Sequence, residues 1–111
     1  MANTFTRKLS RGIGTSANNV GSYTVGSSTT TIVVGMSVTN TSASAITANV
    51  YINDVSTANT YIVTNAPISA GSSLVVGGGD QKIVLITGDK MYVQTSASSS
   101  ADVVMSIMEI T

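Results

Sequence analysis

Apolar and polar residues alternate along several stretches of this 111-residue chain, and this is the period of a half-buried β-strand. Two such runs, 31–39 and 45–53, are separated by the polar segment Asn40–Ser44. Their even-numbered residues are predicted to face a core: Ile32, Val34, Met36, Val38, Ile46, Ala48, Val50 and Ile52. We therefore predict that the two runs form a β-hairpin with a short loop.

Other strands are predicted at short intervals, with turn-forming residues between them: 20–25, 60–65, 72–76, 81–87, 91–95 and 102–111. Pro67 has no N–H to donate to a neighbouring strand, so it places its segment at a sheet edge or in a connection. The last strand is apolar on both faces. We expect it either to lie in the centre of the domain or to be covered on one face by another chain.

About eight or nine short strands and no helical periodicity predict an all-β fold. We expect a single antiparallel β-sandwich, jelly-roll-like or immunoglobulin-like, with an extended N-terminal arm. The predicted organisation is a basic arm at 1–18 and a β-sandwich domain at 19–111.

The composition restricts the chemistry that the chain can perform. There is no Cys, His or Trp, and only 9% of the residues are charged. This excludes disulfide scaffolds, zinc and iron–sulfur sites, cysteine nucleophiles and histidine-based triads. We therefore expect neither an enzyme nor a bound cofactor or metal.

The net charge of zero conceals an uneven distribution. Arg7, Lys8 and Arg11 lie near the N-terminus, whereas the rest of the chain has two basic and five acidic residues. The basic segment is interpreted either as a solvated terminus or as an arm that docks on an acidic neighbour. With Phe5 as its lone aromatic residue, it is too small for a nucleic-acid surface.

Residues that resemble ligand sites are better explained as turns. Asp54, Asp80, Asp89 and Asp102 each lie beside a turn and lack the alternate spacing of a calcium loop. The glycine-rich segments 12–14 and 77–80 are not followed by a helix, which a phosphate-binding loop requires.

The longest apolar runs are short and the N-terminus lacks a leader-like apolar segment, so we expect no membrane partner and synthesis in a host cytoplasm. Tyr51 falls on the polar side of its strand. It is a candidate glycan contact, with cross-strand packing as the alternative.

Four segments, in their order along the chain, carry a resemblance to a known class: 37–51, Pro67–Leu74, Lys82–Val93 and Asp102–Ile110. Together they resemble small virion structural proteins of tailed bacteriophages. The resemblance implies a β-sandwich on the virion exterior, either a head decoration (cement) protein or a component of neck, tail or fibre. It brings no catalytic residues.

The expected function is therefore adhesion between virion subunits. The expected partners are the major capsid protein or neck and tail proteins, together with further copies of the chain, and the expected location is the virion. Candidate contacts are residues of the arm and of the last strand: Phe5, Arg7, Lys8, Arg11, Val103, Met105 and Ile107. A glycan-binding module that uses Tyr51 is the alternative from another class.

Overall fold

The computed structural model describes residues 2–56, 58–77 and 82–111. Their secondary structure consists of strands and one 3-10 turn, with these bounds: β1 Asn3–Ile13, β2 Asn18–Asn19, η1 Val20–Ser22, β3 Thr30–Asn40, β4 Ile46–Asn53, β5 Asn59–Ile68, β6 Ser73–Gly77, β7 Ile83–Leu85, β8 Lys90–Thr95 and β9 Ala101–Ile110.

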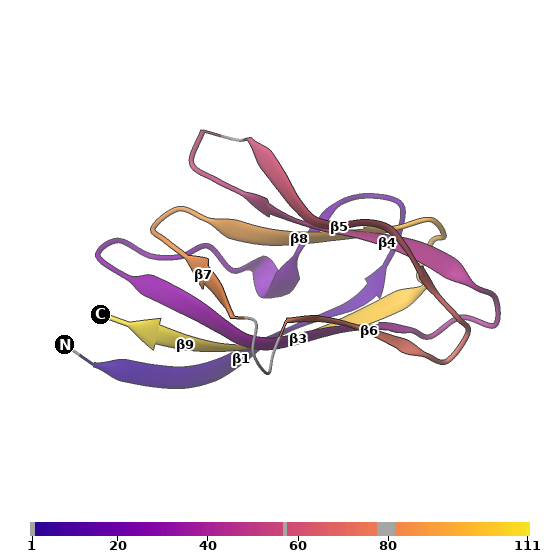
Figure 1. The fold of residues 1–111 in the computed structure, drawn as a ribbon, viewed down its shortest axis with the longest axis horizontal. Coiled ribbons are helices and arrows are strands. Elements are labelled where there is room, and N and C mark those ends of the chain that lie inside the picture. Colours follow the sequence, from indigo (N-terminus) through magenta and orange to yellow (C-terminus); the bar gives the residue numbers. More distant parts are fainter. Residues whose placement is uncertain (1, 57, 78–81) are drawn as a thin grey trace.

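The strands form two antiparallel sheets that pack face to face as a β-sandwich (Figure 1). Sheet A has the order β1-β9-β3-β6, and β7 also pairs with β3; sheet B has the order β2-β8-β4-β5. Because β6 and β7 pair with successive parts of β3, they occupy one position in sheet A. The resulting order of eight positions is that of a jelly roll. The predicted fold class is confirmed.

The core lies between the sheets and is filled by one face of each long strand. Strands β8 and β9 alternate buried and less buried residues along most of their length, as the sequence pattern predicts. On β3 the prediction is confirmed for Met36 and Val38 but is wrong for Ile32 and Val34. A bulge between Val33 and Gly35 shifts the alternation, so Thr31 and Val33 are buried instead. Fully buried side chains come from both sheets: Val33, Val38, Val50, Leu85, Met91, Val93, Val103, Met105 and Ile107.

The predicted hairpin between 31–39 and 45–53 is wrong, although both strands exist. β3 belongs to sheet A and β4 to sheet B, so the Asn40–Ser44 loop crosses from one sheet to the other. Asn40 is fully buried, and its side-chain amide donates to the carbonyls of Ser44 and Ile68, at 2.8 and 3.0 Å. Its Oδ1 accepts from the Ser42 N–H at 2.9 Å. These bonds satisfy the buried polar groups of the crossover.

The predicted strand at 20–25 is wrong: Val20–Ser22 form η1, and residues 23–25 have no regular secondary structure. Gly21 adopts a φ of +62°, and a Cβ there would lie 2.6 Å from the Cβ of Lys8. A residue with a side chain would be strained in this conformation and would also collide with β1. Gly21 thus allows β1 to pass close to the turn.

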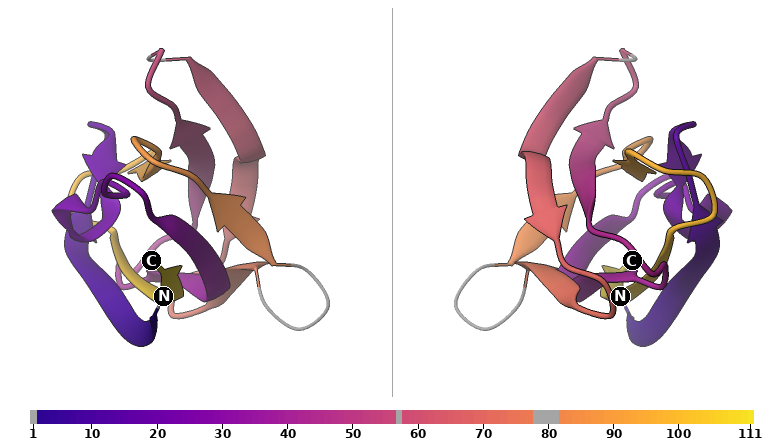
Figure 2. Two further views of the ribbon diagram at one scale, coloured as in Figure 1. Left: turned by 90° about the vertical axis from the view of Figure 1, so that its left-hand side faces the viewer. Right: turned by 90° about the vertical axis from the view of Figure 1, so that its right-hand side faces the viewer.

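The predicted extended arm is a strand of sheet A. From Asn3 to Ile13 it forms β1, which pairs with β9 from Asn3↔Ile110 to Ser10↔Val103 and again at Ile13↔Ala101. The N-terminal end of β1 is fixed to residue 111, because the Thr111 N–H donates to the Ala2 carbonyl at 3.0 Å. Figure 2 shows β1 at one edge of the sandwich, with both termini at the same end of the molecule.

The last strand, β9, is central, lying between β1 and β3 in sheet A. Of the two readings offered by its apolar pattern, the central position is the one observed. Pro67 lies in β5, which is an edge strand of sheet B, in agreement with the prediction from its missing N–H.

Candidate assembly surfaces

The outer face of sheet A, which points away from the core, carries two rows of mainly apolar residues. One row of cross-strand neighbours runs Phe5, Met108, Ile32, Val84 across β1, β9, β3 and β7. A second row runs Leu9, Val104, Ser37, Val75 across β1, β9, β3 and β6. We call these two rows the apolar face.

Many side chains of the apolar face are open to solvent. Phe5 is 73% exposed and Val75 72%, and Val84, Val104 and Leu9 are also classed as exposed. Isolated exposed apolar residues are ordinary, but each of these rows forms a patch across four adjacent strands, with Arg7 and Ser106 between the two rows. Patches of this kind mark contact surfaces.

A shallow pocket of about 490 Å³ lies between the two rows. Phe5, Arg7, Val34 and Ser106 contribute to its lining, together with the adjacent Thr6 and Ile107. Arg7 is exposed and lies opposite Ser106 in the β1–β9 register, so it brings a positive charge to a pocket whose apolar surface comes from Phe5 and Val34.

The predicted contact residues of β1 do not share one environment. Phe5 and Arg7 line the pocket, whereas Lys8 points to the other side of the strand. Its Nζ lies 4.9 Å from the centroid of the Tyr23 ring, a cation–π distance. Arg11 is exposed at the bulge between Ser10 and Ile13. Lys8 is thus held by its own chain.

The predicted contacts of β9 are on the wrong side of the strand. Val103, Met105 and Ile107 are at most 1% exposed and their side chains belong to the core, although Ile107 also borders the pocket. The outward residues of β9 are Val104, Ser106 and Met108, which the prediction did not select. The sequence contained the information needed to select these residues, because the second apolar face of this strand is the one that can lie outside the core.

The outer face of sheet B differs, because its aromatic residues cover one another. Tyr61, Tyr51 and Tyr92 are cross-strand neighbours on β5, β4 and β8. The Tyr51 ring lies 4.8 Å from that of Tyr61 and 5.4 Å from that of Tyr92, and is nearly parallel to the latter. Tyr51 is only 7% exposed. Burial raises the pKa of Tyr51, and the neighbouring Tyr61 and Tyr92 add to the rise.

This packing corrects the glycan prediction for Tyr51. Sugar stacking requires an open ring face, and the ring of Tyr51 lies between two other rings. The cross-strand packing given as the alternative is what the structure shows.

Three polar side chains, those of Tyr23, Thr31 and Glu109, form a hydrogen-bonded cluster at the end of the core. The Tyr23 hydroxyl donates to Glu109 at 2.8 Å and contacts the buried Thr31 hydroxyl at 2.6 Å. Burial raises the pKa of Tyr23; the Thr31 bond opposes this, and the Glu109 carboxylate adds to it. These contacts fix the turn after η1 against β3 and β9.

Asp54, Asp89 and Asp102 accept hydrogen bonds from backbone groups near turns or at the β1 bulge and do not converge on a shared ligand. Asp54 Oδ1 accepts from the Ser56 N–H at 2.9 Å, and Asp89 Oδ2 accepts from the Ile86 N–H at 2.9 Å, as predicted for turn residues. Asp102 accepts from the Gly12 N–H. Asp80 and the segment 78–81 lie outside the described residues. Across the described ranges, no cluster of three potential metal-ligating side chains occurs.

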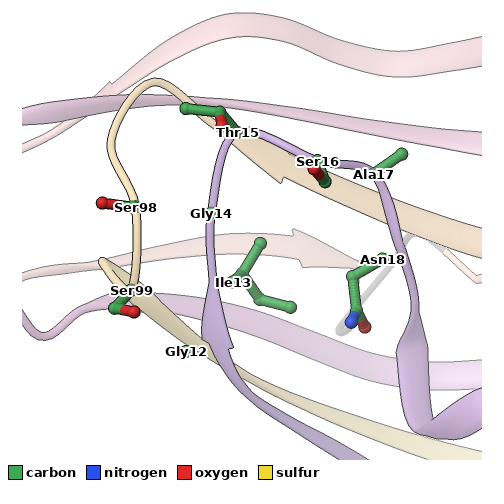
Figure 3. Close-up of a pocket in the computed structure, with 9 residues that line it drawn as sticks. All are labelled: Gly12, Ile13, Gly14, Thr15, Ser16, Ala17, Asn18, Ser98 and Ser99. Carbon is green, nitrogen blue, oxygen red and sulfur yellow. The ribbon is translucent and has the colours of Figure 1, made fainter.

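A second pocket, of about 320 Å³, lies at the loop after β1 (Figure 3). It is lined by Gly12–Asn18 together with Ser98 and Ser99 of the β8–β9 loop. Its lining contains no charged side chain. Nearby, the Ser100 N–H donates to the Ile13 carbonyl and the Thr95 N–H donates to the Gly14 carbonyl, each at 2.9 Å, and these bonds tie the two loops together.

The fold and surfaces together define a jelly-roll β-sandwich with one exposed apolar outer face. Among the described residues, no helix is long and apolar enough to span a membrane. No family model matches the chain, and no curated protein matches it.

Solved structures share this fold. One comes from Bacillus endospore appendages, described as disulfide-linked pili: the TM-score is 0.54 at 12% identity, over 100% of this chain and 91% of that chain. Another is an infectious bursal disease virus particle, with a TM-score of 0.56 at 10% identity over 96% of this chain and 30% of that chain. At these identities the likeness shows the fold alone. The present chain has no cysteine, so disulfide links have no counterpart in it.

Proposed function

We propose that the protein is a structural subunit of an assembled particle and that its apolar face is the main contact surface. The observation that carries this proposal is the pair of apolar rows across sheet A, open to solvent in a chain with only 9% charged residues. A monomer with such a surface and so little charge tends to associate. Burial of the face would contribute about 25 cal/mol per Å² of apolar area.

Structural likeness to pilus and viral-particle chains supports a role in assembly. The finer proposal is a location on the exterior of a tailed-bacteriophage virion, as a head decoration protein or as a neck, tail or fibre component. It is supported by the sequence resemblance described above. The partners proposed with it are the major capsid protein or neck and tail proteins, and further copies of this chain.

The apolar face is tested by Val84→Thr and Val75→Thr, which keep the shape and β-propensity of an exposed strand position and add a hydroxyl. We expect each change alone to raise the concentration for half-assembly about fivefold, since it weakens a contact by about 1 kcal/mol. Sedimentation velocity measures the assembly, and thermal unfolding checks the fold.

The matched control is Thr64→Val on β5, because it makes the reverse exchange at an exposed strand position of sheet B. It should leave assembly unchanged. Equal assembly of all variants, or wild-type protein that is monomeric and absent from purified particles, would contradict the proposal.

A second candidate function, glycan binding, keeps only Tyr61 as an open ring, since it is the exposed member of the tyrosine row. A glycan array tests it, and sugar binding lost in Tyr61→Ala would favour it over assembly.

A further inference from the structure

The pocket of the apolar face is chemically specific because a cation lies inside apolar walls. Phe5 and Val34 supply apolar surface and Arg7 supplies the charge. The carboxylates of Asp89, Asp102 and Glu109 accept hydrogen bonds from groups other than Arg7, namely the Ile86 N–H, the Gly12 N–H and the Tyr23 hydroxyl. The pocket therefore suits a ligand that carries a carboxylate beside an apolar group.

The turn between β4 and β5 has this combination. Asp54 and Val55 follow each other in the chain, and Val55 is 74% exposed. Figure 2 shows the β4–β5 hairpin extending from the body of the sandwich, and the described residues of 55–61 are all exposed.

The tip is held in a defined shape. Asp54 Oδ1 accepts from the N–H and hydroxyl of Ser56 and from the Ala58 N–H, at 2.9, 2.6 and 3.2 Å. These hydrogen bonds lower the pKa of Asp54, which keeps the carboxylate charged. Gly88 faces Val55 so closely that a Cβ there would lie 1.9 Å from Val55 Cγ1. The β7–β8 turn thus supports the tip from one side.

The tip and the pocket cannot meet within one molecule. The hairpin belongs to sheet B and the pocket opens on the outer face of sheet A, so the core separates them. A contact between them has to join two copies. Such a contact joins two different surfaces, so each pair of copies still has a free tip at one end and a free pocket at the other. Repetition of the contact therefore builds rings or filaments.

We propose that the Asp54–Val55 tip of one copy inserts into the Arg7 pocket of a second copy. Asp54 pairs with Arg7, while Val55 packs against Phe5 and Val34. This inference rests on the proposed assembly function and names the partner of its contact surface as the chain itself. Among the described acids, Asp54 is the one that lies beside an exposed apolar side chain. An exposed ion pair adds little affinity, but it selects the partner surface because like charges repel.

Charge reversal tests this contact. Arg7→Glu alone and Asp54→Arg alone should each raise the concentration for half-assembly about tenfold or more, measured by sedimentation velocity on the full chain. The double variant should regain assembly. An equimolar mixture of the two single variants should also assemble, because each tip then meets a pocket of opposite charge.

One control carries the same charge change away from the pocket and the tip: Arg11→Glu at the bulge of β1. It should assemble as the wild type does. Asp54→Asn keeps the acceptor oxygen of the turn and removes the charge, so its weaker assembly would support the contact even if Asp54→Arg does not fold.

The outcomes separate this contact from the function on which it rests. Wild-type assembly that is insensitive to Arg7→Glu, or single variants that neither the double variant nor the mixture rescues, overturns the tip-to-pocket contact and leaves the assembly function standing. A chain that binds purified particles but remains monomeric alone also overturns the contact only. A monomer that is absent from particles overturns both.

Discussion

On the outer face of sheet A the aromatic and aliphatic side chains stand open to solvent, whereas on the outer face of sheet B the tyrosines pack against one another. Phe5 is one of the most exposed apolar residues of the chain and Tyr51 is buried, although both point away from the core. The difference lies in the neighbours. Tyr51 has a ring on each side, while Phe5 ends a row on an edge strand. We infer that sheet B completes its outer surface within the chain and that sheet A leaves its own for a partner.

Truncation of the central tyrosine should have the largest effect on the fold. Tyr51→Ala removes a buried ring and leaves Tyr61 and Tyr92 without their shared neighbour, so we expect the free energy of unfolding to fall by about 3 kcal/mol. Urea denaturation measures this loss. Tyr51→Phe keeps the ring and should retain most of the stability. A loss below about 0.5 kcal/mol in Tyr51→Ala would mean that sheet B is as open as sheet A.

The same kind of truncation on sheet A should affect assembly and spare the fold. Phe5→Ala should change the free energy of unfolding by less than about 0.5 kcal/mol, because the ring is mostly exposed. The concentration for half-assembly should rise about tenfold, since aromatic residues in a contact pocket contribute strongly to binding. Urea denaturation and sedimentation velocity on one sample separate the two effects. Unchanged assembly would remove Phe5 from the contact.

The smallest effect is expected from alkaline pH. The pKa values of Tyr51 and Tyr23 are raised in the folded chain, so above about pH 10 the unfolded chain releases these protons first. The contribution of these tyrosines to the free energy of unfolding should be fully present below about pH 10 and should fall as the pH rises further. Urea titrations from about pH 8 to pH 11 measure the decline, and Tyr51→Phe should make it less steep. An equal slope in that variant would contradict a buried phenol at this position.

The sequence predicted the strands better than their partners. Alternation identified β3 and β4 because it depends on which face of a strand is buried, and this is a local property. Alternation carries no information on pairing, so the same pattern fits both a hairpin turn and a crossover at Asn40–Ser44. The crossover depends on the buried amide of Asn40, which bonds to Ile68 on another strand. Such a contact between distant segments leaves no local pattern.

The N-terminal strand escaped prediction for a related reason. On β1 the apolar residues Phe5 and Leu9 point outward, and the core side carries Lys8 and Ser10. A basic stretch with few apolar residues is typical of a solvated terminus, so its sequence does not predict a strand. Its place in the sheet comes from pairing with β9, nearly a hundred positions away in the sequence.

The central position of β9 has a consequence for how the chain folds. β1 and β3 are both made early but have no direct contact as neighbours in sheet A, because the final strand lies between them. Sheet A therefore cannot close until residues 101–110 have been synthesised, and pairing across so long a separation is slow. During that interval Leu85, Val33 and Val38 lack the β9 side of their core, and a nascent chain that stalls before residue 101 would be prone to aggregate.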